Sequence, residues 1–463
     1  MSQPCSRPIP PRRARLRAAA RAVLVAWLVG ASGGATAAPE VADPAARVRE
    51  TRLDNGLVVL TLEDHTTPVV SFQMWVRAGS RDESRYTGLA HLFEHMMFKG
   101  SKQIAPEDHA RLIQARGGQV NAFTTRDFTV YHADVSRENL PLVIEIEAER
   151  VGNLSITQET LDSEREVVIE ERRMRVDDQP DGRAIEALFA LSFVAHPYRW
   201  PVIGWQSDVA AATLEACQTF FDHYYAPNNI VIAIVGDFDA DEALALVEAT
   251  FGALPPAAEI PRNPTQEPEQ RGERRATIAF DLRSPVLAVA WHAPPTGHPD
   301  AEALDVLSQI LSDGRSSRLY RRLVYESQLA LGAEGAYWEM QQAGIFYAFV
   351  AVRPGAEIER VESTLFDEIE RVAREPVRPE ELKKAKRQLE VGLVNGLATN
   401  HALANRIGYD FVTLGRIRPL EERLAAIEAV TAEDVQRVAK SYLAADRRSV
   451  VWVVPPAGAE PSR

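Results

Sequence analysis

The sequence predicts an α+β protein made of two similar α/β half-shell domains, each with helices packed on a mostly antiparallel sheet. Three observations carry this prediction: an ordinary globular composition, a proline-rich segment past the middle of the chain, and one pattern that repeats on either side of it. The chain has 463 residues, of which 46% are hydrophobic and 25% charged. Such a chain folds, and it is too long for one compact core.

The proline-rich segment marks the boundary between the two halves. Five prolines fall between residues 255 and 268, too densely for a helix or a central strand. A semi-extended linker is therefore expected over 253–276. The predicted domains on either side are 45–252 and 277–456.

The two flanking stretches repeat one order of elements. Patterns typical of a strand, an apolar helix and a closing strand occur at 70–76, 87–98 and 229–235, and again at 286–291, 301–311 and 449–454. A duplicated α/β unit explains this order, and chance similarity between two α/β segments is the alternative.

The N-terminal segment has the order of features typical of a cleaved export signal. Six arginines and no acidic residue precede Glu40, an apolar run covers 22–31, and Ala35-Thr36-Ala37 offers a cleavage site. The run is short for a membrane anchor, which needs about 20 apolar residues. We therefore expect residues 1–37 to be a signal peptide and the mature protein to be periplasmic, with no membrane span.

The net charge and the cysteine content bear on two questions, whether the protein binds nucleic acid and whether disulfides stabilise it. Removing 1–37 takes away six arginines and no acid, which changes the net charge from −13 to −19 (−13 − 6). An acidic chain does not favour nucleic-acid binding, which normally shows a basic excess. Cys217 is then the single cysteine of the mature chain, so no disulfide can form within it. Packing or a metal must stabilise the exported protein.

The chemistry is expected in the first half, at the pentapeptide His-Leu-Phe-Glu-His. Residues four apart share a helix face, so His91 and His95 can present two imidazoles to one metal ion, with Glu94 beside them. The alternative is a helix whose histidines are half-buried caps or surface residues. A catalytic zinc site needs a third protein ligand and an open position. An acidic helix over 159–173 can supply that ligand, and the residues alone leave four candidates open: Glu164, Glu166, Glu170 and Glu171.

The H-x-x-E-H motif, a glutamate about 75 residues further on and the two similar halves resemble the pitrilysin-type (M16) metallopeptidases, or inverzincins. The same resemblance extends to further stretches, at 117–124, 129–131, 196–204 and 316–320. It implies a zinc-dependent endopeptidase that acts on peptides or unfolded segments in a chamber between two half-shells. The family pattern E-R-x-V-[IV]-x-x-E starts at Glu164 and ends on Glu171. It therefore implies that Glu171 is the third zinc ligand and Glu164 a supporting carboxylate.

The resemblance assigns a role to each group of the expected site. His91, His95 and Glu171 hold one zinc ion per chain, and Glu94 is the general base toward a water that the metal activates. Substrate backbone is expected to add as an extra strand along an exposed edge, formed by Asn121, Ala122, Phe123 and Thr124. A structural asparagine at a strand start is the alternative for Asn121.

The second half departs from the motif. When Gly314 is aligned with Gly100, the positions of the metal motif are occupied by Asp305, Ser308 and Gln309. These residues do not form a zinc clamp, so the second half is expected to serve as a wall or lid.

The substrate-stabilising groups implied by the family are incomplete. Arg318 corresponds to the family's arginine, with a plain solvated arginine as the alternative, but Leu331 stands where its tyrosine is expected. Tyr337 lies six residues later and is not expected to replace it. Either Arg318 and another donor suffice, or a homologous partner subunit, in a homodimer or heterodimer, supplies the missing group. The second arrangement is favoured.

Two other functions compete with a peptidase. The first is a non-catalytic scaffold subunit of the same fold, which the full set of zinc ligands argues against. The second is a peptide-binding protein with a structural metal. Glu94 argues against that function, because a structural site does not need a base beside an open coordination position.

Overall fold

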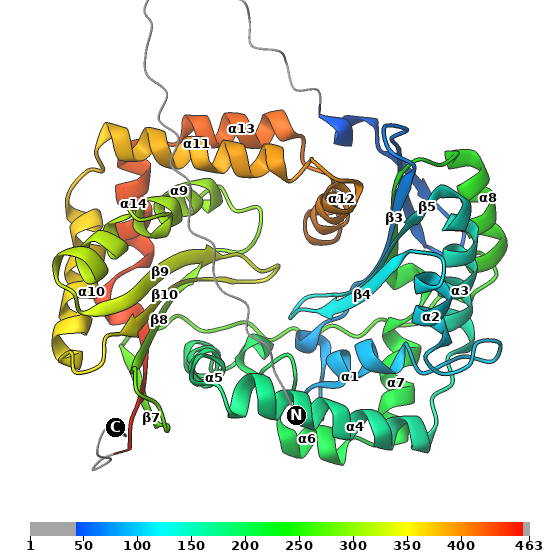
Figure 1. The fold of residues 1–463 in the computed structure, drawn as a ribbon, viewed down its shortest axis with the longest axis horizontal. Helices are drawn as coiled ribbons and strands as arrows, with labels where there is room; N and C mark the ends of the chain where they lie inside the picture. The colour runs from blue at the N-terminus through cyan, green and yellow to red at the C-terminus, as the bar shows by residue number, and fades with distance from the viewer. Residues whose placement is uncertain (1–42, 457–463) are drawn as a thin grey trace, which may run out of the picture. The chain divides into compact units, whose positions relative to one another are not determined.

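Two sheets form the framework of the structure, a computed structural model that describes residues 43–456 (Figure 1). The first has the strand order β1 (Arg49–Arg52), β2 (Val58–Glu63), β6 (Ile230–Gly236), β3 (Val69–Val76), β5 (Thr129–Ser136), β4 (Gln119–Thr124). The second has the order β7 (Arg274–Ala279), β11 (Arg448–Val454), β8 (Val286–Ala293), β10 (Gly344–Val352), β9 (Ala330–Trp338).

Apart from the extra edge strand β1, the two sheets repeat one topology. In each half the first strand of the repeat pairs parallel with the last, as β2 does with β6 and β7 with β11. All other neighbouring strands pair antiparallel. The predicted fold class, two similar halves with mostly antiparallel sheets, is confirmed.

Helices surround both sheets. The first half contributes α1 (Leu89–Met96), α2 (Asp108–Gln114), α3 (Leu140–Asn153), α4 (Gln158–Arg172), α5 (Pro180–Ser192), α6 (Gln206–Ala211), α7 (Leu214–Tyr224) and α8 (Ala240–Phe251). The second contributes α9 (Ala301–Ser312), α10 (Ile358–Arg374), α11 (Pro379–Asn395), α12 (Asn400–Leu414), α13 (Leu420–Ala429) and α14 (Ala432–Tyr442).

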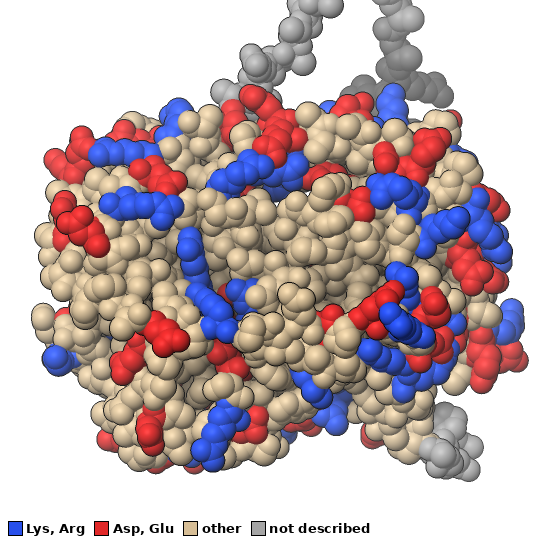
Figure 2. All heavy atoms as spheres, turned by 180° about the vertical axis from the view of Figure 1, so that it is seen from behind, with Lys and Arg blue, Asp and Glu red and all other residues tan. Residues whose placement is uncertain are grey.

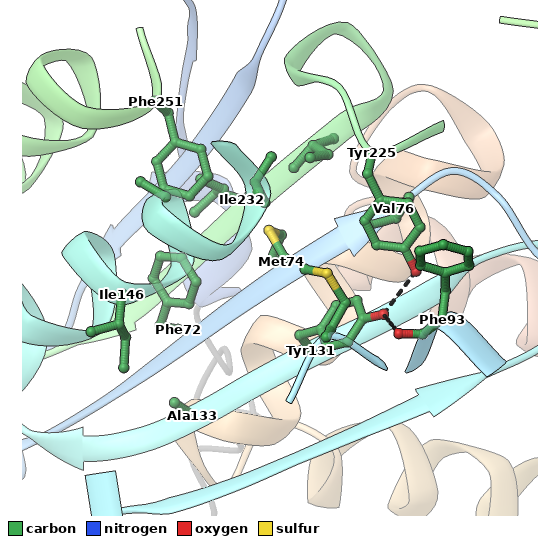
Figure 3. Packing of buried hydrophobic residues seen from close by; sticks show 14 of the residues in the cluster. Phe72, Met74, Val76, Phe93, Tyr131, Ala133, Ile146, Tyr225, Ile232 and Phe251 are labelled. Carbon is green, nitrogen blue, oxygen red and sulfur yellow. Dashed lines mark hydrogen bonds between the residues drawn. The ribbon is translucent and has the colours of Figure 1, made fainter. Parts of the chain in front are cut away.

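The main core of the first half lies between one face of its sheet and its helices (Figure 3). Phe72 and Ile232 from the strands meet Ile146 of α3 and Phe251 of α8 in this cluster. The strands β3 and β6 are almost entirely buried because both of their faces are covered.

Each half covers the second face of the other half's sheet with one helix. Helix α12 packs on β3 and β6 of the first sheet, and α5 packs on β8 and β11 of the second (Figure 1). The approach of α12 is close: a Cβ atom on Gly408 would lie 2.2 Å from Nε1 of Trp75, so this position requires glycine. The two halves therefore share apolar cores.

The predicted linker is an extended segment that hydrogen bonds attach to the first half. Within the described part of the chain, no helix or strand lies between α8 and β7. Arg262 donates to Asp82 at 2.9 Å, and the Glu267 carboxylate accepts from three backbone N–H groups at 194–196. The exact domain boundaries stay a prediction.

Charged side chains of both signs are interspersed on the face shown in Figure 2, which has no broad basic area. Among the described residues, no helix is both long and apolar enough to cross a membrane. The predicted signal peptide, 1–37, lies outside the described residues, so export to the periplasm stays a prediction.

Candidate metal centre

Helix α1 is fixed to the core by the apolar residues of the pentapeptide. Leu92 and Phe93 are fully buried. The Phe93 carbonyl accepts a hydrogen bond from the Tyr131 hydroxyl at 3.4 Å, and Tyr131 shares a second one with Tyr225 at 2.8 Å (Figure 3). With this face held against the sheet, the other face of α1 presents His91, Glu94 and His95 to a cavity.

The start of α1 is positioned by a buried carboxylate and by close backbone packing. Glu83 accepts hydrogen bonds from the backbone N–H groups of Gly88 at 2.8 Å and Ala90 at 2.9 Å. Gly88 has φ +89°, and a Cβ atom there would lie 2.7 Å from the carbonyl oxygen of Ile203. This contact leaves no room for a side chain at position 88, and the close packing fixes the place of the first turn of α1.

Helix α4 brings the acidic residues to the histidines. It begins at a Thr157 cap, whose hydroxyl accepts from the Thr160 N–H at 3.2 Å. Leu161 and Val168, seven residues apart, face the core. Glu164 and Glu171 repeat the same spacing and share a stripe two turns long.

Three side chains converge at the cavity: His91, His95 and Glu171. Glu171 Oε2 lies 3.6 Å from His91 Nε2 and 3.2 Å from His95 Nε2. The two imidazole ring centroids are 4.9 Å apart. Of the four glutamates that the sequence leaves open on this helix, the structure brings Glu171 to both histidines.

The other glutamates of α4 have different surroundings. Glu164 is almost fully buried, and its Oε2 lies 3.4 Å from His95 Nδ1, the ring nitrogen turned away from Glu171. Its second oxygen pairs with Lys99 at 2.9 Å. Glu166 and Glu170 both line the cavity, and Glu170 also pairs with Arg173 at the surface. Glu164 thus occupies the position of a residue that orients a ligand histidine.

The convergent atoms fit a zinc ion. Two ligands about 2.0–2.2 Å from one ion lie about 3.2–3.6 Å apart in a tetrahedral site, which matches the separations here. Glu171 Oε2 is buried and has no hydrogen-bond partner. Its other oxygen is held by Arg175 at 2.7 Å, so one carboxylate oxygen is oriented and the other is free to coordinate.

The electrostatics favour metal binding at His91 and Glu171, whereas a metal must displace a proton from His95. Burial, together with the neighbouring His95, lowers the pKa of His91 and favours its neutral form. Burial also lowers the pKa of His95, but its contacts with Glu164 and Glu171 outweigh burial and raise the value to about 9. A metal competes with that proton, because a ligand histidine must be neutral. Contact with His95 lowers the pKa of Glu171 although burial opposes the shift, so the carboxylate is charged.

Glu94 lies beside the triad and contacts the edge strand β4. Its Oε2 accepts a hydrogen bond from the Thr124 hydroxyl at 2.7 Å. Burial raises the pKa of Glu94, and this hydrogen bond opposes the shift in part. The residues of the predicted substrate edge all line the same cavity of about 1110 Å³: Asn121, Ala122, Phe123 and Thr124. Within the described residues, β4 pairs with β5 on one side and leaves its other edge free.

The second-half residues do not join this site. Arg318 makes a two-pronged ion pair with Glu381 at 2.9 and 3.1 Å and lines a separate cavity. Leu331 is exposed on β9. Tyr337 is buried, and its hydroxyl donates to the Pro294 carbonyl at 2.7 Å. The structure thus does not bring the predicted arginine to the metal centre.

Sequence reasoning missed three residues that shape the centre. Glu83 caps α1 from five residues before Gly88, outside any local capping motif. Lys99 and Arg175 orient the two carboxylates. Arg175 follows Glu171 by four residues, a spacing that could have indicated the ion pair.

Comparisons with known proteins support both halves of this description. Residues 58–204 match "Insulinase (Peptidase family M16)", and residues 211–389 match "Peptidase M16 inactive domain". The chain is similar to the zinc protease PqqE of Helicobacter pylori, with 29% identity over 408 residues that cover 87% of this chain and 92% of the relative.

Two further proteins show the same similarity. An uncharacterized zinc protease of Mycobacterium bovis is 33% identical over 428 residues, which cover 91% of this chain and 96% of the relative. The crystal structure of a protease from Helicobacter pylori superimposes with a TM-score of 0.86 and 28% identity, covering 89% of this chain and 100% of the other. The repeated topology, the convergent histidines and glutamate, and these matches together show that the chain belongs to the M16 peptidase family.

Proposed function

We propose that this protein is a zinc-dependent endopeptidase that hydrolyses peptides or unfolded segments. One observation carries the proposal: His91, His95 and Glu171 converge on one point, with Glu94 beside them, in a cavity bordered by a free strand edge. These three residues would hold a zinc ion, which would supply Lewis-acid chemistry at this point of the cavity.

Glu94 is the residue that moves the proton. It faces the cavity from the same helix as both histidines, and Thr124 fixes one of its oxygens. Burial raises the pKa of Glu94 above its ordinary value. A carboxyl group with a raised pKa can accept a proton from the attacking water and return it to the leaving amine.

The edge strand β4 supports binding of an extended peptide. A peptide that adds to a free strand edge is held by main-chain hydrogen bonds, which give affinity with little dependence on side chains. Thr124 lies at the end of β4 and bonds to Glu94, so a peptide along this edge passes the proposed base. This arrangement suits a peptidase of broad sequence tolerance.

The experiment compares two variants of the purified full chain, Glu94→Gln and Glu170→Gln. Zinc content is measured by mass spectrometry, and cleavage of a quenched fluorescent peptide is followed with and without a chelator. We expect Glu94→Gln to keep zinc and lose turnover, and Glu170→Gln to keep both. Turnover retained by Glu94→Gln contradicts the proposed base. Zinc binding without any turnover in the wild type, alone or mixed with a related subunit, favours the non-catalytic scaffold function.

We further propose that a second chain of similar fold completes the site. Arg318 is engaged by Glu381, Leu331 carries no hydroxyl, and the Tyr337 hydroxyl is buried. The chain therefore leaves the substrate carbonyl without these donors. Light scattering and peptide cleavage at matched concentrations test this: activity should follow dimer formation, and full activity in a monomer contradicts the proposal while leaving the zinc centre untouched.

A further inference from the structure

A second group of metal-ligating side chains lies where the two halves meet. His132 and Asp134 are two residues apart on β5, so both point to the same face of the first sheet. This face is otherwise an apolar core that includes Trp75 and Val130 and is covered by α12. His401 comes from the first turn of α12. We call His132, Asp134 and His401 the interface triad.

The interface triad has nearly the dimensions of the proposed catalytic centre. Each residue offers one ligand atom, and these atoms lie within 4.8 Å of one another. The His132 and His401 ring centroids are 4.8 Å apart, against 4.9 Å for the histidine pair of the catalytic centre. His401 Nδ1 lies 3.0 Å from Asp134 Oδ2, close to the 3.2 Å between Glu171 and its nearer histidine.

Surrounding contacts hold the triad in place. Gln73 lies opposite His132 on β3 and donates to the His401 carbonyl at 3.1 Å, which ties the start of α12 to the sheet. An ion pair between Asp134 and His401 explains two of the three residues. It does not explain His132, whose Nδ1 is buried and has no hydrogen-bond partner. A buried imidazole nitrogen without a partner is costly unless something binds it.

We propose that the interface triad binds a transition-metal ion, with zinc as the expected natural occupant. Two imidazoles and one carboxylate form a donor set that suits zinc and cobalt and does not suit magnesium or calcium, which prefer oxygen ligands. The metal bridges β5 of the first half and α12 of the second, so it stabilises the contact between the halves.

The experiment uses a variant that lacks the histidines of the proposed catalytic centre, so that metal binding at the interface triad can be measured by itself. The full chain with His91→Ala and His95→Ala is stripped of metal and titrated with Co²⁺, and visible absorption and bound cobalt after desalting are recorded. We expect one Co²⁺ per chain and a higher melting temperature with the metal. Adding His401→Gln, and separately His132→Gln, should abolish both effects.

His65 provides the matched control. Its Nδ1 lies 2.7 Å from Asp237 Oδ1, so it forms a histidine–carboxylate pair, but it does not belong to either metal-ligating triad of the described residues. Adding His65→Gln to the double variant should leave the single Co²⁺ in place. Should the double variant be unstable, the wild type is titrated instead, with two Co²⁺ expected and one in His401→Gln.

Two results overturn the proposal. One is a folded double variant that binds no Co²⁺ at micromolar concentration, in which case the triad is an ion pair with a stacked histidine. The other is a bound Co²⁺ that survives both His401→Gln and His132→Gln, which places the ion elsewhere. Neither result bears on the peptidase proposal, because the catalytic centre is absent from the double variant.

Discussion

Helices α1 and α9 occupy the same place in the two repeats, yet α1 carries the histidines of the proposed metal centre and α9 has no histidine at the matching positions. Position 94 of α1 aligns with position 308 of α9, and both residues contact the third strand of their repeat. Glu94 accepts from the Thr124 side chain of β4 at 2.7 Å, whereas Ser308 accepts from the Tyr337 backbone N–H of β9 at 2.8 Å. The matching contact between helix and edge strand thus involves the proposed base in the first half and a buried serine in the second.

The comparison extends to the neighbouring positions. Asp305 of α9 aligns with His91 of α1, and Gln309 with His95. Burial, with Glu339 nearby, raises the pKa of Asp305 to about 8. The second half has kept the fold and replaced the zinc ligands, which agrees with its match to an M16 inactive domain. The topology alone therefore does not set the function of either half.

The largest expected effect is loss of the metal from the first half. Glu171→Gln removes the charged ligand, so zinc affinity should fall by more than the roughly 100-fold that a supporting residue costs. Titration against a competing fluorescent chelator measures the change. Glu170→Gln, one residue away on the exposed side of α4, should keep the wild-type affinity. Equal losses in both variants would mean that Glu171 is not the ligand.

The next largest effect is expected at Glu164, which contacts the His95 ring nitrogen that is turned away from Glu171. Glu164→Gln weakens the hold on His95 Nδ1 and on Lys99, and zinc affinity should fall by roughly 10–100-fold. The control is Glu166→Gln, because Glu166 lines the cavity without belonging to the triad. The same chelator titration is used, and an unchanged affinity in Glu164→Gln would remove Glu164 from the site.

A crossed pair of substitutions tests the contrast between the two helices directly. Thr124→Val removes the hydrogen bond to Glu94, and kcat should fall about tenfold with little change in stability. Ser308→Ala leaves the buried Tyr337 N–H without a partner, and the free energy of unfolding should fall by about 1–3 kcal/mol with kcat unchanged. Peptide cleavage and urea denaturation of both variants measure the pair. If both variants shift the same quantity, the division of roles is wrong.

The last expected effect depends on pH. Asp305 has a folded-state pKa of about 8 against an ordinary value of 3.8, so the folded protein binds this proton more tightly than the unfolded chain does. Its contribution to stability is therefore full below pH 3.8 and is lost as the pH rises to about 8. Asp305→Asn removes this loss. The gain in melting temperature over wild type should be larger at pH 8 than at pH 5, and an equal gain at both would contradict the shift.

The sequence predicts the parts of the molecule that depend on local patterns. Alternating and apolar runs place β3, β8 and the closing strands, and the spacing of His91 and His95 places both on one helix face. The choice of Glu171 among four glutamates of one helix needed the family resemblance, because an acidic helix gives no local signal for which carboxylate turns inward. The free edge of β4 followed from the glycines before it and the β-rich run after it.

Contacts between distant segments could not be predicted in this way. Glu83 caps α1 across a loop, and Arg318 pairs with Glu381 of a helix more than 60 residues away. Neither contact leaves a periodic pattern, because each depends on how finished elements pack. The exchange of α5 and α12 between the sheets is likewise invisible in the amphipathic pattern, which shows that a face is apolar and does not show what covers it.

Helices α5 and α12 each pack on the sheet of the other half. The two halves should therefore stay associated even when the peptide chain between them is cut. Without α12 the first sheet would expose a broad apolar face, and without α5 the second sheet would do the same. Neither half is therefore expected to remain soluble by itself. A single proteolytic cut in the extended stretch 253–273 should leave two fragments that elute together in gel filtration and separate only in denaturant.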